Sequence, residues 1–200
     1  METAAAEAPG LESPAAAAEA ERHEVERARA GDPIAFRTLV KRYQDRAYGL
    51  ALRIVRSPAE AEEVAQDAFV RVWKALAGFR GEAAFSTWLY RIVARRALDR
   101  AEQLRTRRGR EAELESAGEP AVDPEPRADA ESVLRARRLE HLMARLTDVQ
   151  RAVVTLYYYR DQSVEEVARL LAMPENTVKT HLSRARSALR EAWVNEENAG

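Results

Sequence analysis

The 200-residue sequence predicts an all-α protein in which two small helical domains are joined by a flexible acidic linker. No run of alternating β-branched residues is bounded by turn signals, and half-buried strands are recognised by that alternation. Apolar residues instead recur at helical spacing in several segments, two of which follow capping-box sequences. A proline-rich acidic stretch separates two groups of such segments. These observations favour helices over sheets and two units over one.

The first predicted helix spans residues 34–55, where apolar residues recur every three or four positions. They are Phe36, Leu39, Val40, Tyr43, Ala47, Leu50 and Ile54. Ser57 and Glu60 then form a capping-box sequence with a proline at the first helical position, which predicts the start of a second helix. The apolar stripe behind this box consists of Val64, Ala65, Ala68, Phe69, Val72, Trp73 and Leu76.

A break and a basic helix complete the first block. Residues 78–84 are expected to interrupt the helices, and Ser86 or Thr87 is expected to cap the next one. That helix runs from Trp88 to about Arg105 and is rich in arginine. We therefore expect three or four helices in residues 25–110.

The second block, residues 134–197, shows the same kind of pattern. Helices are expected over residues 134–146 and from about residue 148 to 159. A second capping box, Ser163 to Glu166, opens a short helix that ends at a break over residues 172–175. Two short helices around such a break are typical of a helix-turn-helix. The residues expected on the inward face of the last helix are Val178, Leu182, Ala185, Leu189 and Trp193.

Charge divides the chain in the same places. Residues 1–24 carry six glutamates and one arginine and few large apolar side chains, so we expect a disordered acidic tail. Residues 111–133 hold eight acids and three prolines, which predict a flexible linker. Residues 25–110 carry 19 basic and 10 acidic groups. This asymmetry indicates a polyanionic partner, and an arginine-rich solvated surface is the alternative.

Several classes of protein are excluded or disfavoured. The chain has no cysteine, which rules out disulfides, thiolate catalysis and zinc sites built on thiolates. The longest charge-free stretches are eight residues, too short for a membrane span, and the N-terminus lacks the pattern of a signal peptide. We expect a cytoplasmic protein. His23, His141 and His181 form no ligand pair, and no glycine-rich phosphate loop occurs, so we expect no catalytic residue, no metal and no cofactor.

The last helix carries the clearest binding chemistry. Its outward side is rich in cations and short polar groups, which suit phosphates and base edges in the major groove. A solvated face of an ordinary antiparallel helix pair remains the alternative. The candidates for DNA contact are Asn176, Thr177, Lys179, Thr180, Ser183, Arg184, Arg186 and Arg190.

Together the two blocks resemble the extracytoplasmic-function (ECF) group of bacterial RNA polymerase sigma factors, over roughly residues 25–105 and 134–193. The resemblance lies in the order and spacing of several phrases. They are GDPIAF at residues 31–36, AEEVAQDAF at 61–69, FRGE at 79–82, FSTWLYRI at 85–92, LTDVQ at 146–150, SVEEVA at 163–168 and TVKTHLSRAR at 177–186. Arg95 departs from the family, which often has asparagine there, so the preferred minus-ten sequence stays open.

The resemblance implies that the first block grips the polymerase clamp and melts the minus-ten element. An exposed charged face would meet core polymerase, with a solvated face as the alternative: Glu62, Glu63, Gln66, Asp67, Arg71 and Lys74. Aromatic and basic residues would hold the separated strand, since unstacked bases need aromatic surfaces and nearby cations. These are Arg80, Phe85, Ser86, Trp88, Tyr90, Arg91, Arg95, Arg96 and Arg100.

The second block would read the minus-thirty-five element and dock on the polymerase flap. The implied partners are core RNA polymerase, promoter DNA and an anti-sigma factor, with no membrane, and the implied role is transcription initiation in response to a stress or envelope signal. The alternative is a free-standing helix-turn-helix regulator whose first block is a sensor or dimerisation domain. The basic, aromatic segment over residues 85–100 favours the sigma factor, because a sensor domain has no need of it.

Overall fold

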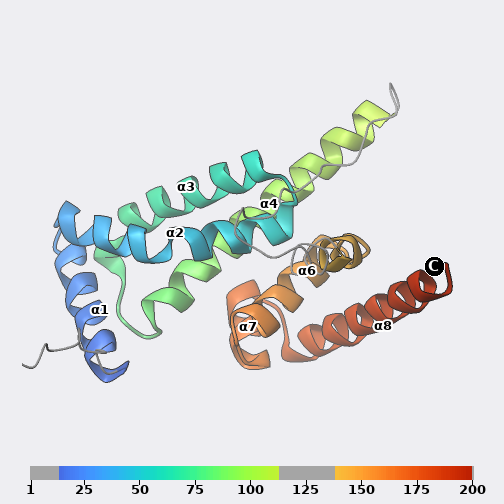
Figure 1. The fold of residues 1–200 in the computed structure, drawn as a ribbon. Coiled ribbons are helices and arrows are strands. Elements are labelled where there is room, and N and C mark those ends of the chain that lie inside the picture. The colour runs from blue at the N-terminus through green and yellow to red at the C-terminus, as the bar shows by residue number, and fades with distance from the viewer. Residues whose placement is uncertain (1–13, 113–137, 200) are drawn as a thin grey trace, which may run out of the picture.

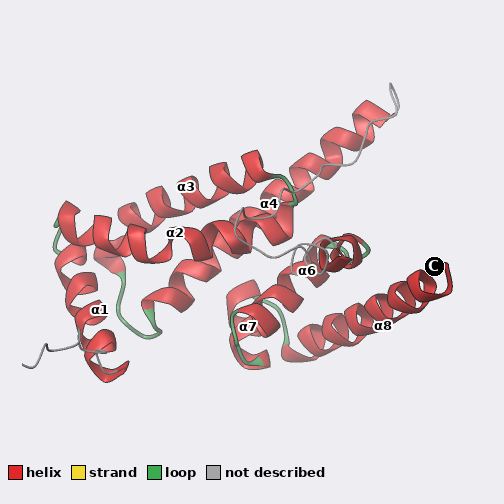
Figure 2. Ribbon diagram, in the orientation of Figure 1, coloured by secondary structure: helices red, strands yellow, loops and turns green. Residues whose placement is uncertain are grey.

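The computed structural model describes residues 14–112 and 138–199, and these residues form helices joined by loops, without strands (Figure 2). The all-α prediction is confirmed. The N-terminal unit contains α1 (Pro14–Arg29), α2 (Pro33–Val55), α3 (Pro58–Ala75), the short 3₁₀ turn η1 (Leu76–Gly78) and α4 (Phe85–Ala112). The C-terminal unit contains a helical turn at 138–144, α6 (Asp148–Val154), the π-helical turn η2 (Thr155–Tyr159), α7 (Val164–Leu171) and α8 (Glu175–Ala199).

In the N-terminal unit α2, α3 and α4 pack side by side, and α1 lies across the start of α2 (Figure 1). Asp32 caps α2 by accepting hydrogen bonds from the backbone N–H groups of Ile34 and Ala35. The apolar stripes predicted for α2 and α3 face inward, although Phe36 and Val40 are only half-buried and Trp73 is partly exposed.

The expectation of a disordered tail over residues 1–24 is wrong from Pro14 onward, because those residues belong to α1. Contacts with the rest of the N-terminal unit hold this helix in place. The carboxylate of Glu21 accepts a 2.6 Å hydrogen bond from the hydroxyl of Tyr43, and Val25 and Ala28 are buried against the bundle. Burial and this hydrogen bond raise the pKa of Tyr43. Residues 1–13 lie outside the described part of the chain.

Two predicted caps in this unit do not form. The side chain of Ser57 makes no capping hydrogen bond, and the carboxylate of Glu60, which would form the other bond of the box, accepts a hydrogen bond from Arg100. Helix α4 begins at Phe85, so Ser86 and Thr87 lie within its first turn rather than before it. It also extends past Arg105 to Ala112, and the rest of the predicted linker falls within residues 113–137, which the structure does not describe.

The two units pack against each other, with α6 against α2 and α4, and α7 against α4. Their buried apolar side chains form one continuous cluster. Arginines of the second unit reach across the boundary. Arg160 donates a 2.7 Å hydrogen bond to the carbonyl oxygen of Arg46, and its guanidinium lies over the ring of Tyr90. None of the described helices combines the length and apolar character that crossing a bilayer requires.

Candidate nucleic-acid and polymerase interfaces

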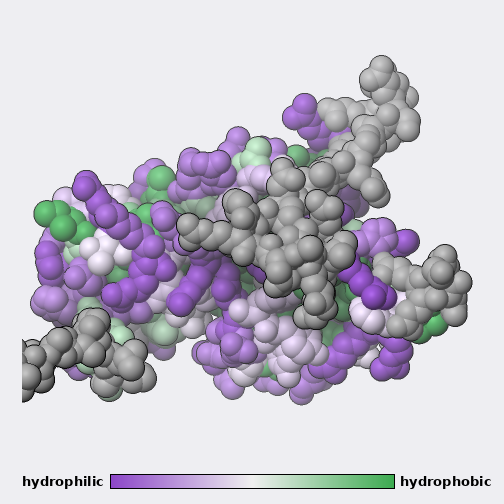
Figure 3. Space-filling model, in the orientation of Figure 1, coloured by the Kyte–Doolittle hydropathy of each residue, from purple (hydrophilic) through white to green (hydrophobic). Residues whose placement is uncertain are grey.

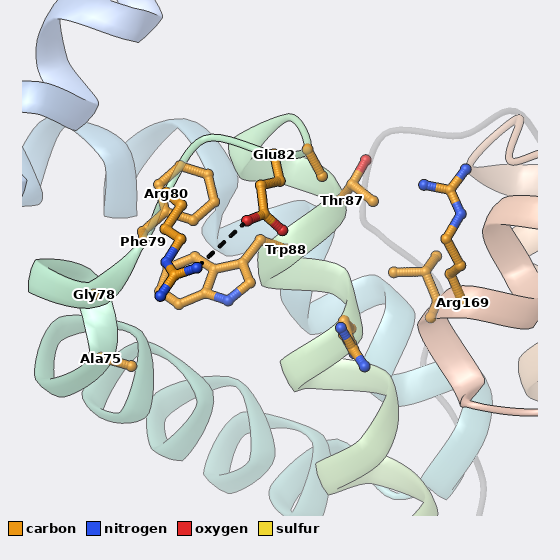
Figure 4. Close-up of a pocket in the computed structure, with 11 residues that line it drawn as sticks. Ala75, Gly78, Phe79, Arg80, Glu82, Thr87, Trp88 and Arg169 are labelled. Carbon is orange, nitrogen blue, oxygen red and sulfur yellow. Dashed lines mark ion pairs between the residues drawn. The ribbon is translucent and has the colours of Figure 1, made fainter.

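The loop between η1 and α4 covers a cavity of about 600 Å³ (Figure 4). On one side the rings of Phe79 and Trp88 stack, with centroids 4.8 Å apart and planes 30° apart. Gly81 lets the loop turn back, because its φ of +73° is a conformation that side chains other than glycine rarely adopt. Arg169 and Leu170 of α7 line the cavity from the second unit. An aromatic wall thus faces an open space large enough for a small planar group.

Cations surround the mouth of this cavity. Arg80 lies on the loop with its side chain 83% exposed and only a distant contact to Glu82, at 4.0 Å. Arg91 lines the cavity from α4, and Arg95 is exposed one turn further along. A negatively charged strand that approached the aromatic wall would therefore meet the exposed cations Arg91 and Arg95, together with Arg80, which shares the cavity with its partner Glu82.

Phe85 and Tyr90, predicted to contact the separated strand, are buried. Phe85 packs against Phe79 and Tyr43, and Tyr90 lies beneath the guanidinium of Arg160. Neither ring can reach a base without unfolding, and Phe85 supports the loop through its contact with Phe79. Ser86 is half-buried in the first turn of α4. The sequence pattern could not distinguish exposed from supporting rings, because both kinds lie in the same segment.

Two of the predicted DNA-contacting arginines are held by acids of α3. Arg96 Nε donates to Asp67 Oδ2 at 2.6 Å, and Arg71 donates to the same oxygen at 2.8 Å. These hydrogen bonds lower the pKa of Asp67, and the bond from Arg71 has the larger effect. Arg100 pairs with Glu60 and Glu63, and the bond to Glu60 raises the pKa of Arg100. The predicted polymerase face and the predicted DNA face therefore share ion pairs.

The outward face of α3 presents the predicted charged residues together with two apolar ones. Glu62, Glu63, Gln66, Arg71 and Lys74 are exposed, and Asp67 is partly exposed. Between them Val70 is 50% exposed and Trp73 38% exposed. The ring of Trp73 packs on that of Phe36, with centroids 4.8 Å apart. This apolar centre was not predicted from the sequence, because Trp73 fits the inward stripe and Val70 lies outside that stripe. Hydrophilic side chains otherwise dominate the visible surface of both units (Figure 3).

The helix-turn-helix is present as α7 and α8. Ser163 and Glu166 form both hydrogen bonds of the capping box, and α7 ends at Ala172 in the left-handed conformation. Val178, Leu182 and Ala185 are buried, whereas the opposite side of α8 is exposed. Of the predicted contact residues only Thr177 is half-buried; the exposed ones are Asn176, Lys179, Thr180, Ser183, Arg184, Arg186 and Arg190.

Three local contacts act on this face. Lys179 lies 3.7 Å from Glu175, and the hydroxyl of Thr180 donates to the carbonyl oxygen of Asn176 at 2.8 Å. Arg186 leans toward Tyr158 of η2, whose hydroxyl accepts a 2.9 Å hydrogen bond from Arg186 Nε. Arg184 and Arg190 are also exposed.

Known proteins match both units. Residues 39–108 match Sigma-70 region 2, and residues 136–189 match Sigma-70, region 4. The chain is 35% identical over 184 residues to the RNA polymerase sigma-H factor of Pseudomonas aeruginosa, covering 84% of this chain and 91% of that one. It is 31% identical to the ECF RNA polymerase sigma factor SigW of Bacillus subtilis, covering 84% and 93% of the two chains. The chain belongs to the ECF group of bacterial RNA polymerase sigma factors.

Solved structures of sigma factors share the fold. One is the sigma factor RpoE from Bartonella quintana in complex with the anti-sigma factor NepR, with a TM-score of 0.65 and 20% identity over 79% of this chain and 96% of that one. Another is CnrH in complex with the cytosolic domain of CnrY, with a TM-score of 0.62 and 25% identity over 88% and 98%. As an ECF sigma factor, the protein binds core RNA polymerase and promoter DNA and directs transcription initiation.

Proposed function

We propose that this ECF sigma factor opens the minus-ten element by capturing an unstacked base against the Phe79–Trp88 wall. The observation that carries the proposal is the stacked aromatic pair at an open cavity with exposed Arg80 and Arg91 around it. Stacking on an aromatic side chain contributes about 1–3 kcal/mol per base and tolerates any sequence. This contribution offsets part of the cost of separating a base pair.

Core polymerase would bind the outward face of α3. Interfaces of this kind combine an apolar centre with a polar rim, and Val70 and Trp73 supply such a centre within the charged residues from Glu62 to Lys74. Arg71, Arg96 and Asp67 form one ion-paired group between this face and the DNA face. Polymerase binding and strand capture would therefore be coupled through α3 and α4.

Helix α8 would enter the major groove of the minus-thirty-five element. Asn176, Thr180 and Arg184 follow at intervals of four residues and form a stripe suited to base edges. Lys179, Arg186 and Arg190 carry longer cations suited to phosphates. We propose that the protein has no catalytic activity of its own, acts in the cytoplasm and responds to a stress or envelope signal.

An anti-sigma factor is the proposed regulator. The support is that a sigma factor of the same fold was solved bound to an anti-sigma factor. The product of a gene adjacent to that of this chain is the candidate to test. We expect it to form a stoichiometric complex with the purified chain and to block binding of core polymerase. A complex that leaves polymerase binding intact would contradict a regulatory role.

Two tryptophans provide a reciprocal test of strand capture and polymerase binding. Trp88→Ala is expected to lower the affinity of the full chain for a fluorescein-labelled random 12-nucleotide single strand by roughly fivefold or more, because one stacking surface is lost. Trp73→Ala is the matched control, since it removes a partly exposed tryptophan of the same unit. It should leave single-strand affinity intact and weaken capture of core polymerase instead. Unchanged single-strand affinity in Trp88→Ala, with an unaltered melting temperature, would refute base capture at this cavity.

A further inference from the structure

Tyr158 lies outside the helix-turn-helix and was not among the predicted DNA-contacting residues. It belongs to the π-helical turn η2, which closes α6. Its side chain is 50% exposed, and its ring packs edge-on against Tyr157, with centroids 4.9 Å apart. The phenol is therefore fixed in direction by its neighbour while one side of it stays open to solvent.

The hydroxyl of Tyr158 contacts Arg186 of α8. Arg186 Nε donates a 2.9 Å hydrogen bond to the Tyr158 hydroxyl, and the guanidinium carbon lies 5.8 Å from the ring centroid. Arg186 follows the buried Ala185, so the backbone of α8 is anchored at this point. The two contacts fix the direction of a long cation that would otherwise sample many rotamers.

Tyr158 and Arg186 keep hydrogen-bond donors that the bond between them does not use. A phenolic hydroxyl both donates and accepts, so the oxygen that accepts from Arg186 still carries its own proton. A guanidinium has five N–H donors, and the bond to Tyr158 uses the one on Nε. A hydroxyl proton and terminal guanidinium N–H groups therefore lie side by side, and these are the groups by which proteins bind DNA phosphates.

We infer that Tyr158 is a DNA-backbone contact whose hydroxyl donates to the same phosphate oxygens that Arg186 binds. The inference rests on the proposed placement of α8 in the major groove. Arg190 follows Arg186 by one turn and is also exposed, so a backbone strand beside α8 would meet both cations. Tyr158 adds a contact with the DNA backbone from η2, outside the recognition helix α8.

Removing the hydroxyl and removing the guanidinium should change DNA affinity and its salt dependence in different ways. Tyr158→Phe removes a neutral donor and keeps the ring, so it should lower the affinity of the full chain for a 30-base-pair random duplex by about threefold to tenfold without changing the salt dependence. Arg186→Ala removes a cation, so the slope of log affinity against log salt should flatten by about 0.9. Because both groups serve one phosphate, Tyr158→Phe should have a smaller effect when Arg186 is already alanine.

Tyr157→Phe is the matched control, since it removes one hydroxyl from the adjacent, less exposed tyrosine and should leave DNA affinity unchanged. Full affinity in Tyr158→Phe would overturn the inference, and a lowered melting temperature with unchanged affinity would show a brace for α8 instead. Lys179→Ala and Arg190→Ala, which remove cations assigned to phosphates, distinguish the two proposals. If both weaken binding and Tyr158→Phe does not, only the role of Tyr158 fails. If neither does, or the wild-type chain binds no duplex, the placement of α8 in the groove fails.

Discussion

The guanidinium of Arg151, in α6, donates two hydrogen bonds to the carbonyl oxygen of Ile54, 97 positions earlier at the end of α2, at 3.1 and 3.3 Å. A third bond, of 2.6 Å, reaches the carbonyl of Leu146, and Asp148 neutralises the charge. Arg151 is only 7% exposed, and burial lowers its pKa. The side chain of Arg151, in the second unit, thus supplies hydrogen-bond donors to a backbone carbonyl in the last turn of α2, in the first unit.

Arg151→Met is expected to loosen the contact between the two units. The change leaves buried carbonyl oxygens without donors, which costs roughly 1–3 kcal/mol in the free energy of unfolding. The melting temperature should fall by about 2–4 °C for each kcal/mol. Thermal unfolding followed by circular dichroism measures this. Arg145→Met, an exposed arginine of the same unit, is the control, and equal melting temperatures for the two variants would contradict the account.

Two serines that look alike in the sequence should respond differently to truncation. Ser163 accepts the hydrogen bond of a complete capping box, so Ser163→Ala should lower the free energy of unfolding by about 1 kcal/mol. Ser57 makes no such bond, and Ser57→Ala should change it little. Urea denaturation of both variants measures the difference. A larger loss at Ser57 would show that its hydroxyl does cap α3.

These serines also show how far the sequence could predict the fold. Helical periodicity and capping residues predicted α2, α3, α7 and α8, because those signals are local. Whether Glu60 completes the box or pairs with Arg100 depends on a partner 40 positions away, so the pattern at residues 57–60 could not decide it. The same limit applies to α1, which is anchored through Tyr43.

The candidate sites were predicted in part for the same reason. Residue type and spacing identified the exposed side of α8, and all but Thr177 of its predicted residues lie at the surface. In α4 the sequence predicted DNA contacts both for Arg91, which is exposed, and for Phe85 and Tyr90, which are buried. Helical spacing does not show how deeply a residue is buried when the helix has neighbours on several sides. Tyr158 was missed because its role depends on a contact with Arg186 across 28 positions.

The ion pairs of Asp67 predict a specific dependence of stability on pH. Hydrogen bonds from Arg71 and Arg96 lower its pKa in the folded state, so its contribution is present above the unfolded value of about 3.9 and is lost as pH falls through the folded pKa. Asp67→Asn should therefore lower the melting temperature at pH 6, and the gap from wild type should narrow toward pH 3. Asp45→Asn, at an exposed carboxylate of α2, is the control. A gap that stays constant from pH 6 to pH 3 would show that it does not come from the ionised carboxylate of Asp67.

Arg184 should govern sequence preference. A bidentate contact to a base edge discriminates by about 1–3 kcal/mol, whereas a phosphate contact does not depend on sequence. Arg184→Ala is therefore expected to bring the affinities for a minus-thirty-five duplex and for a random duplex closer together by fivefold or more. Arg190→Ala should weaken both affinities alike. Fluorescence anisotropy with both duplexes distinguishes the two residues, and equal effects of Arg184→Ala on both would contradict a reading role.

Transcription in vitro tests the central claim most directly. Core RNA polymerase is incubated with sheared genomic DNA, with and without the purified chain, and the 5′ ends of the transcripts are sequenced. The account predicts new 5′ ends that depend on the chain, share sequence elements near minus ten and minus thirty-five, and decline with Trp88→Ala and with Arg184→Ala. The same 5′ ends with and without the chain would contradict the conclusion that it directs initiation.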